Sequence, residues 1–405
     1  MSPEIAKGQS LEELDGNGSD LSGLEEFDRS MRRFMSERRI TAGSLAVTCR
    51  GRLVLARAYS DPAADLRVTP TSLFRIASLS KPLTATAVLG LVQDGLLELR
   101  TPILDVLDLR PAVGWDREPR IDQITVAHLL QHLGGWDRDG AFDPMFRDHA
   151  IAGELNLPLP IARRDIRTYM ASRPLQHAPG TTYAYSNFGY SLLGRIIERV
   201  TGGSYEAFVR QRLFEPLRVS RPALGRTLRQ YRLPDEVVYR STHEGRSVFA
   251  PGDVRVPSPY GAWNLENMDA HGGWVASAID LVRFAAAFNT PTEYPILSES
   301  MIETAFGIPV NLGSGEIKPG VSYYGCGWSV RDWGDGRRNT WHNGSLPGTH
   351  TLLVRRWKGD LNWCALFNQR DDPSGLNYSD IDPLLHKAAD RVGQWPDHDL
   401  FNRYL

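Results

Sequence analysis

The chain has 405 residues, a formal net charge of −2 at pH 7, and 41% hydrophobic and 23% charged residues. This length allows one large domain or two closely packed ones, and the composition is ordinary for a globular protein. The balanced charge gives no reason to expect a nucleic-acid or anionic-membrane partner. No apolar run reaches the roughly 18 residues that predict a membrane span.

Residues 1–22 are polar and rich in Gly, Ser, Asp and Glu, which predicts a flexible tail. They lack a basic start followed by an apolar run, so they do not resemble a secretory signal. The three cysteines are odd in number and stand in apolar or aromatic runs: Cys49, Cys326 and Cys364. This usage indicates reduced core residues, and we therefore expect a cytoplasmic protein.

A helix and a hairpin are predicted next. Five apolar residues recur at helical spacing: Leu24, Phe27, Met31, Phe34 and Met35. Two β-rich runs then follow, and they are broken at Arg50-Gly51, which predicts a hairpin turn there.

The middle of the chain reads as helical. The segment 74–95 contains the apolar run ATAVLGLV, and further helices are predicted at 125–132, 188–202 and 204–214. Ser277 with Asp280 forms a capping-box pattern that opens another apolar helix.

The last third returns to strands, rich in β-branched and aromatic residues, at 323–333, 339–344, 349–357 and 361–368. A final helix is predicted around residues 380–392. Strands at both ends and helices between them indicate an α+β fold, in which both chain ends build one antiparallel sheet flanked by helices. We expect a sheet domain from residues 23–73 and 270–405, a mainly helical domain from 74–269, and an active site between them.

Ser78 and Lys81 are the first candidate catalytic pair. A spacing of three residues places both side chains on one face of a helix. The chain has only five lysines, and this is its single Ser-x-x-Lys match. A desolvated lysine can take the proton of a serine nucleophile, although a helix cap with a solvated lysine gives the same pattern.

Two later segments carry further candidates. Tyr185 and Asn187 follow a Pro-Gly turn and precede a helix; the tyrosine could act as a base only if its pKa of about 10 fell by some three units, and the asparagine can bind a substrate carbonyl. His342, Gly344 and Ser345 end a strand. Gly344 permits close approach to the backbone, and the Ser345 N–H with that of Ser78 would form an oxyanion hole.

Taken in order, Ser-x-x-Lys, Tyr-Ser-Asn and His-x-Gly resemble the serine β-lactamase and penicillin-binding-protein superfamily. The surrounding residues are similar to the branch with class C β-lactamases, family VIII carboxylesterases and D-amino-acid-specific peptidases, over about residues 25–370. The resemblance implies a β-lactamase/transpeptidase-like fold and a serine hydrolase that works through an acyl-enzyme on carboxylic esters or amides. It implies no cofactor.

The resemblance also implies roles. Ser78 would be the acylated nucleophile, Lys81 would help to deprotonate it, and Tyr185 would accept and later donate a proton. Asn187 would orient the acyl side of the substrate. His342 would occupy the place of the cation in the third motif.

Two departures from the family's pattern affect the expected activity. β-Lactamases of this branch usually carry lysine where His342 stands, so a small ester or amide substrate is favoured over a β-lactam. The segment HLGGWD also differs from the family's usual small and hydroxyl residues. β-Lactamase, D-Ala-D-Ala peptidase and acyltransferase activities stay open as alternatives, and a non-catalytic penicillin-binding sensor is disfavoured by the intact Tyr185 and His342.

Other patterns are set aside. His128 and His132 have a spacing that can bind zinc, but no third ligand cluster accompanies them, so helix packing is the better interpretation. No Gly-x-Ser-x-Gly elbow occurs, which argues against an α/β-hydrolase. Trp136, Trp263 and Trp274 lie near glycine-rich loops; packing is favoured for each over a place in an acyl pocket.

Overall fold

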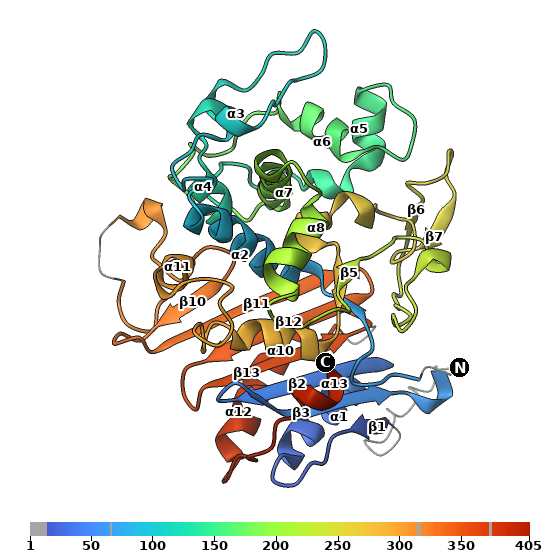
Figure 1. Ribbon diagram of the computed structural model, residues 1–405. Helices are drawn as coiled ribbons and strands as arrows, with labels where there is room; N and C mark the ends of the chain where they lie inside the picture. Colours follow the sequence, from blue (N-terminus) through green and yellow to red (C-terminus); the bar gives the residue numbers. More distant parts are fainter. Residues whose placement is uncertain (1–13, 65–66, 314–316, 372–374) are drawn as a thin grey trace.

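An eight-stranded sheet dominates the computed structural model, which describes residues 14–64, 67–313, 317–371 and 375–405 (Figure 1). Every neighbouring pair of its strands is antiparallel. From edge to edge the strands are β1 (Asp15–Gly18), β3 (Arg52–Ser60), β2 (Ala42–Cys49), β13 (Leu361–Phe367), β12 (Thr349–Arg356), β11 (Arg338–Leu346), β10 (Ser329–Asp332) and β9 (Ser322–Tyr324).

Strands from both chain ends meet at the centre of this sheet, as predicted, because β2 pairs with β13. The hairpin predicted at Arg50-Gly51 is confirmed. Both turn residues have positive φ, +50° and +77°, which is the two-residue turn whose twist suits a hairpin. The strand predicted at 323–333 is interrupted instead, since Gly327 has a φ of +82° and reverses the chain between β9 and β10.

The expected tail, residues 1–22, needs a correction. Residues 1–13 lie outside the described residues, but Asp15–Gly18 form β1 and pair with β3. The backbone hydrogen bonds of an edge strand order this polar segment, which has no apolar pattern that would predict a strand.

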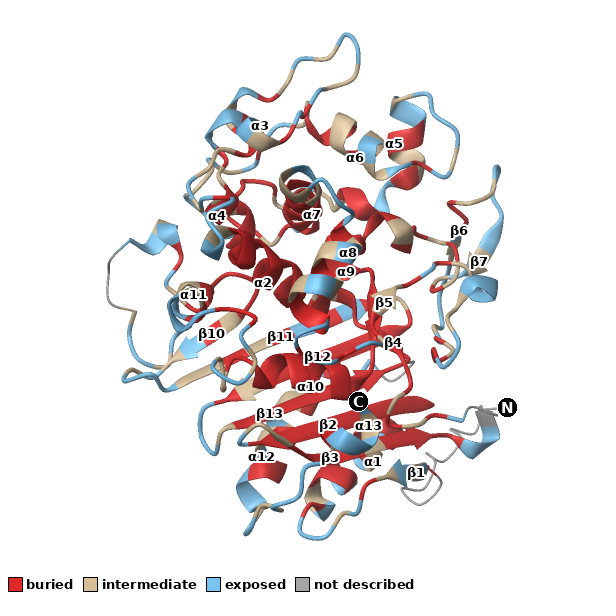
Figure 2. Ribbon diagram, in the orientation of Figure 1, coloured by how far each residue is buried: buried red, intermediate tan, exposed pale blue. Residues whose placement is uncertain are grey.

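Helices cover both faces of the sheet (Figures 1 and 2). Helices α1 (Glu25–Glu37) and α12 (Ile381–Arg391) pack together on one face and share a hydrophobic core with the central strands. Helix α10 (Ala278–Ala286) lies on the opposite face, where it contacts β2, β12 and β13. The capping box of Ser277 and Asp280 is confirmed at its start.

The helical region is inserted between the two sets of strands (Figure 1). Its helices are α2 (Ser80–Gln93), α3 (Ile103–Val106), α4 (Val126–Leu130), α5 (Asp148–Glu154), α6 (Arg163–Met170), α7 (Asn187–Thr201), α8 (Tyr205–Val209) and α9 (Asp269–Gly272). Helices α11 (Glu299–Ala305) and α13 (Phe401–Tyr404) follow later. A small antiparallel sheet has three strands in the order β4 (Phe74–Arg75), β8 (Trp274–Ala276) and β5 (Ala223–Leu224). A second pairs β6 (Glu244–Arg246) with β7 (Arg255–Pro257).

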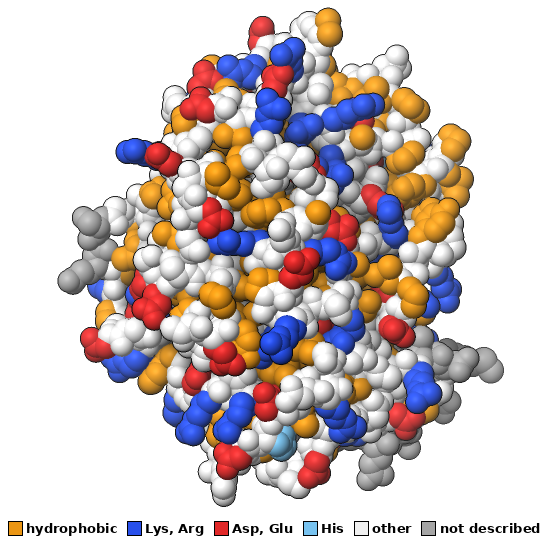
Figure 3. All heavy atoms as spheres, viewed as in Figure 1, with side chains coloured by type: hydrophobic (Ala, Val, Ile, Leu, Met, Phe, Trp, Pro, Cys, Tyr) orange, Lys and Arg blue, Asp and Glu red, His pale blue; other side chains and the backbone are white. Residues whose placement is uncertain are grey.

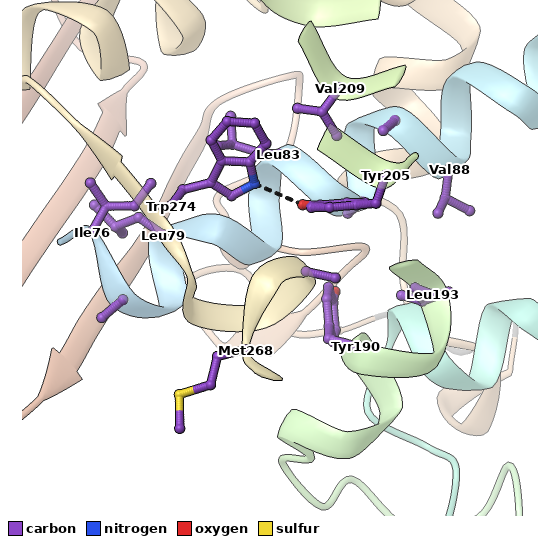
Figure 4. Packing of buried hydrophobic residues seen from close by; sticks show 14 of the residues in the cluster. Ile76, Leu79, Leu83, Val88, Tyr190, Leu193, Tyr205, Val209, Met268 and Trp274 are labelled. Atoms are coloured by element: carbon purple, nitrogen blue, oxygen red, sulfur yellow. Dashed lines mark hydrogen bonds between the residues drawn. The ribbon is translucent and has the colours of Figure 1, made fainter. Parts of the chain in front are cut away.

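Helix α2 is buried from Ser80 to Leu91 and is the centre of this region. Figure 4 shows apolar side chains from α7, α8 and β8 around it. The indole of Trp274 donates to the Tyr205 hydroxyl at 2.9 Å, and that hydroxyl also contacts the Thr84 hydroxyl at 2.6 Å. Trp136 and Trp263 are buried as well, so packing is confirmed for all three tryptophans.

Charges of both signs are interspersed over the face drawn in Figure 3. None of the helices formed by the described residues combines the length and the apolar character needed to cross a membrane. The three cysteines are buried and unpaired, as expected.

Candidate active site

Ser78 lies in a strained turn where the helical region meets the sheet. It belongs to a 3₁₀ turn, Ala77–Leu79, that leads directly into α2 and contacts β11 and β12. Ala77 has a φ of +49°, a left-handed conformation that costs an alanine free energy and is held by the surrounding structure. The turn keeps the Ser78 hydroxyl half-buried at the mouth of a buried helix.

Lys81 is fully buried one turn later and has three partners. Its Nζ lies 3.1 Å from Ser78 Oγ, 2.7 Å from Asn187 Oδ1 and 3.0 Å from the His271 carbonyl. Burial, and then the positive charge of Arg138, holds the pKa of Lys81 well below its ordinary value. The lysine is therefore suited to accept a proton from the serine.

Tyr185 reaches the same serine from the loop before α7, whose first turn is capped by the Ser186 side chain. The Tyr185 hydroxyl donates to Ser78 Oγ at 2.9 Å. Burial raises the pKa of Tyr185, although the Ser78 hydrogen bond and Arg138 act against this shift. The condition under which Tyr185 could act as a base, a lowered pKa, is therefore not met, and the phenol keeps its proton.

His342 lies near these residues but does not supply a cation. It is buried in β11, where Nε2 accepts from the Tyr324 hydroxyl at 3.0 Å and Nδ1 donates to the Asn343 carbonyl at 2.7 Å. Burial, and then Lys81, lowers the pKa of His342 to about 3, so the imidazole is neutral at pH 7. The side chain in the place of the third-motif cation is thus uncharged, which strengthens the departure from lysine noted in the sequence.

Gly344 and Ser345 bring the edge of β11 against the serine turn. A Cβ on Gly344 would lie 2.6 Å from the Ile76 carbonyl oxygen and 3.0 Å from the Ala77 Cβ, so only glycine allows this approach. The exposed Ser345 side chain turns away to Arg370, at 3.3 Å. The oxyanion hole formed by the backbone N–H groups of Ser78 and Ser345 stays a prediction.

Three contributors were missed by sequence reasoning. Asp143 accepts from Asn187 Nδ2 at 2.5 Å and so extends the polar chain from Lys81; burial raises the pKa of Asp143. The Arg138 guanidinium lies over the Tyr185 ring, 4.3 Å from its centroid. The Tyr324 ring packs against both His342 and Tyr185 and is nearly perpendicular to each. The departure of HLGGWD from the family's pattern was the one signal near Arg138.

The paired histidines have structural contacts. His128 Nδ1 accepts from the Thr125 N–H in a capping box, and His132 Nδ1 accepts from the Ser186 N–H. The His132 ring also packs on Tyr185, with centroids 4.2 Å apart. Among the described residues, nowhere do three His, Cys, Asp or Glu side chains gather in a way that could hold a metal ion.

A pocket of about 350 Å³ shares Tyr324 with the site, because Tyr324 lines the pocket and also contacts His342 and Tyr185. Its lining combines aromatic, aliphatic and polar side chains: Gln131, Leu133, Tyr183, Pro309, Asn311, Leu312, Ser322, Tyr323, Tyr324, Ser329 and Trp341. A cavity of this size and chemistry can hold an apolar or aromatic substrate group.

The chain is similar in sequence to known proteins. The chain is 30% identical to Esterase EstB of Burkholderia gladioli over 73% of this chain and 76% of that protein. It is 26% identical to Penicillin-binding protein 4* of Bacillus subtilis, over 82% of this chain and 68% of that protein.

Solved structures show the same fold. An octameric penicillin-binding protein homologue from Pyrococcus abyssi matches with a TM-score of 0.67 and 24% identity, covering 94% of this chain and 79% of that one. D-amino acid amidase from Ochrobactrum anthropi matches with a TM-score of 0.66 and 22% identity, covering 92% and 99%. The Beta-lactamase family model matches residues 27–381, and the chain therefore belongs to the Beta-lactamase family.

Proposed function

We propose that this member of the family is a serine hydrolase of small carboxylic esters or amides, with Ser78 as the nucleophile. The observation that carries the proposal is the convergence on one hydroxyl. Lys81 Nζ and Tyr185 Oη lie 3.1 Å and 2.9 Å from Ser78 Oγ, although the three residues come from two distant segments of the chain. A serine needs a neighbouring base to become nucleophilic, and burial makes Lys81 that base.

Acylation and deacylation in this proposal move one proton between Ser78, Lys81 and Tyr185. Ser78 Oγ attacks the substrate carbonyl carbon while its proton passes to the neutral Lys81 amine. The bond to the leaving group breaks, and the Tyr185 phenol gives its proton to that group. The Lys81 ammonium restores the phenol proton. Water enters by the reverse sequence and releases the acid, so the enzyme returns to its starting state.

Asn187 and the β11 edge position the substrate in this proposal. The Asn187 amide is held between Lys81 and Asp143, which fixes its orientation next to the acyl group. The backbone N–H groups of Ser78 and Ser345 bind the developing oxyanion; the close approach of Gly344 to the serine turn supports that pairing.

An ester is favoured over a β-lactam as the substrate. The neutral His342 cannot attract the carboxylate of a β-lactam as a lysine does. The name of the 30% identical relative, an esterase, supports the same choice. The pocket lined in part by Tyr324 gives room for an apolar group of the substrate.

A turnover panel tests the proposal. It contains alkyl and aryl esters, D-amino-acid amides, D-Ala-D-Ala peptides and nitrocefin, each with a competing alcohol in a parallel reaction. We expect ester hydrolysis that falls by at least about 10³-fold in Ser78→Ala, and poor nitrocefin turnover. Full activity in Ser78→Ala contradicts the proposal. Ester product formed mainly from the added alcohol would instead indicate an acyltransferase.

We also propose a cytoplasmic location, supported by the three unpaired, buried cysteines. Cell fractionation with an antibody against the native protein tests it: recovery with cytoplasmic markers is expected, and recovery outside the cytoplasm would contradict it.

A further inference from the structure

The groups around Tyr185 include many that can titrate but few that carry charge. Those facing Tyr185, Lys81 or Arg138 come from several elements: Lys81, His132, Asp139, Asp143, Tyr183, Tyr190, His271, Tyr324 and His342. Burial lowers the pKa of each of the three histidines, so all three imidazoles are neutral at pH 7.

Lys81 and Asp143 do not supply a net charge either. The Asn187 amide joins them, and burial shifts the pKa of each toward its uncharged form. Whether their proton lies on the amine or on the carboxyl, the pair sums to zero. Of the described groups around Tyr185, Arg138 is the one that is permanently charged and contacts the ring.

Arg138 is placed to act on Tyr185. Its guanidinium carbon is 4.3 Å from the ring centroid, within the range of a cation–π contact. Its buried Nε–H donates no hydrogen bond. Its ion-pair contact is with Asp139, at 3.3 Å, and the Asp139 side chain is 79% exposed. An exposed partner of this kind neutralises little of the charge.

We propose that Arg138 is the positioning residue that supplies the positive charge for proton transfer at Ser78, acting through the Tyr185 ring that it covers. The inference rests on the proposed function. When Tyr185 gives its proton to the leaving group, the phenolate oxygen becomes negative for as long as Lys81 holds the serine proton. The guanidinium stabilises that anion and disfavours protonation of Lys81 before substrate binds. A loop arginine thus takes the place of the cation that His342 cannot supply.

The sign of the pH effect follows. The active free enzyme has a neutral Lys81, so kcat/KM rises as the pH increases through the Lys81 pKa. Arg138 lowers that pKa. Removal of the charge in Arg138→Gln should therefore move the acid limb of the kcat/KM profile upward by about one pH unit. At a fixed pH on the limb, this shift adds a fall of about tenfold to the smaller loss on the plateau, where the Tyr185 anion lacks the stabilising charge.

The experiment compares pH profiles of phenyl ester hydrolysis for the full-length enzyme, Arg138→Gln, Arg138→Lys and Arg147→Gln. Arg147 is the matched control because its guanidinium lies over Phe142, at 5.2 Å. We expect the acid limb of the kcat/KM profile to shift only in Arg138→Gln. In Arg138→Lys, which keeps the positive charge, the limb should stay in its original place. An unshifted limb in Arg138→Gln, or a uniform loss at every pH in both Arg138 variants, overturns the inference. Ser78→Ala separates the two proposals, since its inactivity upholds the function whatever Arg138 does.

Discussion

At the scale of single residues, the site divides proton handling between two side chains. In the proposed mechanism, Lys81, which is buried with a lowered pKa, acts as the base, and Tyr185, which keeps its proton, acts as the acid. Both contact the same serine oxygen, so a proton can move from one side of Ser78 to the other without a large movement.

Loss of the Tyr185 hydroxyl should therefore depend on the leaving group. An alkoxide needs a proton to depart, and p-nitrophenolate does not. We expect Tyr185→Phe to lower kcat/KM for an alkyl ester by about 10²- to 10⁴-fold and to affect the p-nitrophenyl ester of the same acid much less. Steady-state kinetics on the two esters measures this difference.

Tyr231→Phe, at an exposed tyrosine, serves as the control and should leave both rates unchanged. Equal losses on both esters in Tyr185→Phe would show that the hydroxyl holds Ser78 in place and does not donate a proton.

At the scale of elements, the contact of β11 with the serine turn decides whether the site forms. The strand brings Gly344 against Ile76 and Ala77 from a segment more than 260 residues away in the chain, and the Thr351 hydroxyl on β12 donates to the Ile76 carbonyl at 3.0 Å. The turn is thus held by two neighbouring strands.

Gly344→Ala should break this arrangement. The added Cβ meets backbone at 2.6 Å, which we expect to lower the free energy of unfolding by about 1–3 kcal/mol and to reduce kcat by displacing the strand. Gly153→Ala is the control. Gly153 is helical with open space around it, so the substitution should be neutral or stabilising by up to about 1 kcal/mol. Denaturant unfolding and ester kinetics test both variants; wild-type activity in Gly344→Ala would contradict this account.

Local patterns predicted the elements well and their interactions less well. The Arg50-Gly51 turn, the Ser277 capping box and the buried helix after Ser78 follow from backbone preference, capping and apolar content, which adjacent residues determine. The neutral state of His342 and the position of Arg138 depend on burial by segments far away in the chain. No sequence pattern records that burial, so the sequence did not indicate that His342 is neutral or that Arg138 lies over Tyr185.

At the scale of the whole molecule, the sheet joins the two ends of the chain and buries histidines in its strands. His350 in β12 packs against Phe367 and Tyr378, and burial lowers the pKa of His350 to about 4. The unfolded chain binds this proton near pH 6.5 and the folded chain does not, so the fold loses stability as the pH falls from about 6.5 toward 4.

His350→Gln should therefore flatten the loss of stability in acid. Each protein's free energy of unfolding is compared at pH 7 and at pH 5. We expect the decrease in His350→Gln to be smaller, by up to about 2 kcal/mol, than the decrease in the unsubstituted protein. Asp148, whose pKa burial raises to about 7, acts in the opposite direction in both proteins and cancels in the comparison. Urea unfolding at the two pH values provides the measurement, and equal pH dependence of the two proteins would contradict the burial of a neutral His350.

The most direct test of the central claim is intact-mass spectrometry after incubation with a fluorophosphonate, followed by peptide mapping. The account predicts one added phosphonyl group per chain, located on Ser78, absent in Ser78→Ala and retained in Ser80→Ala. A label that persists in Ser78→Ala, or that maps to another residue, would contradict it.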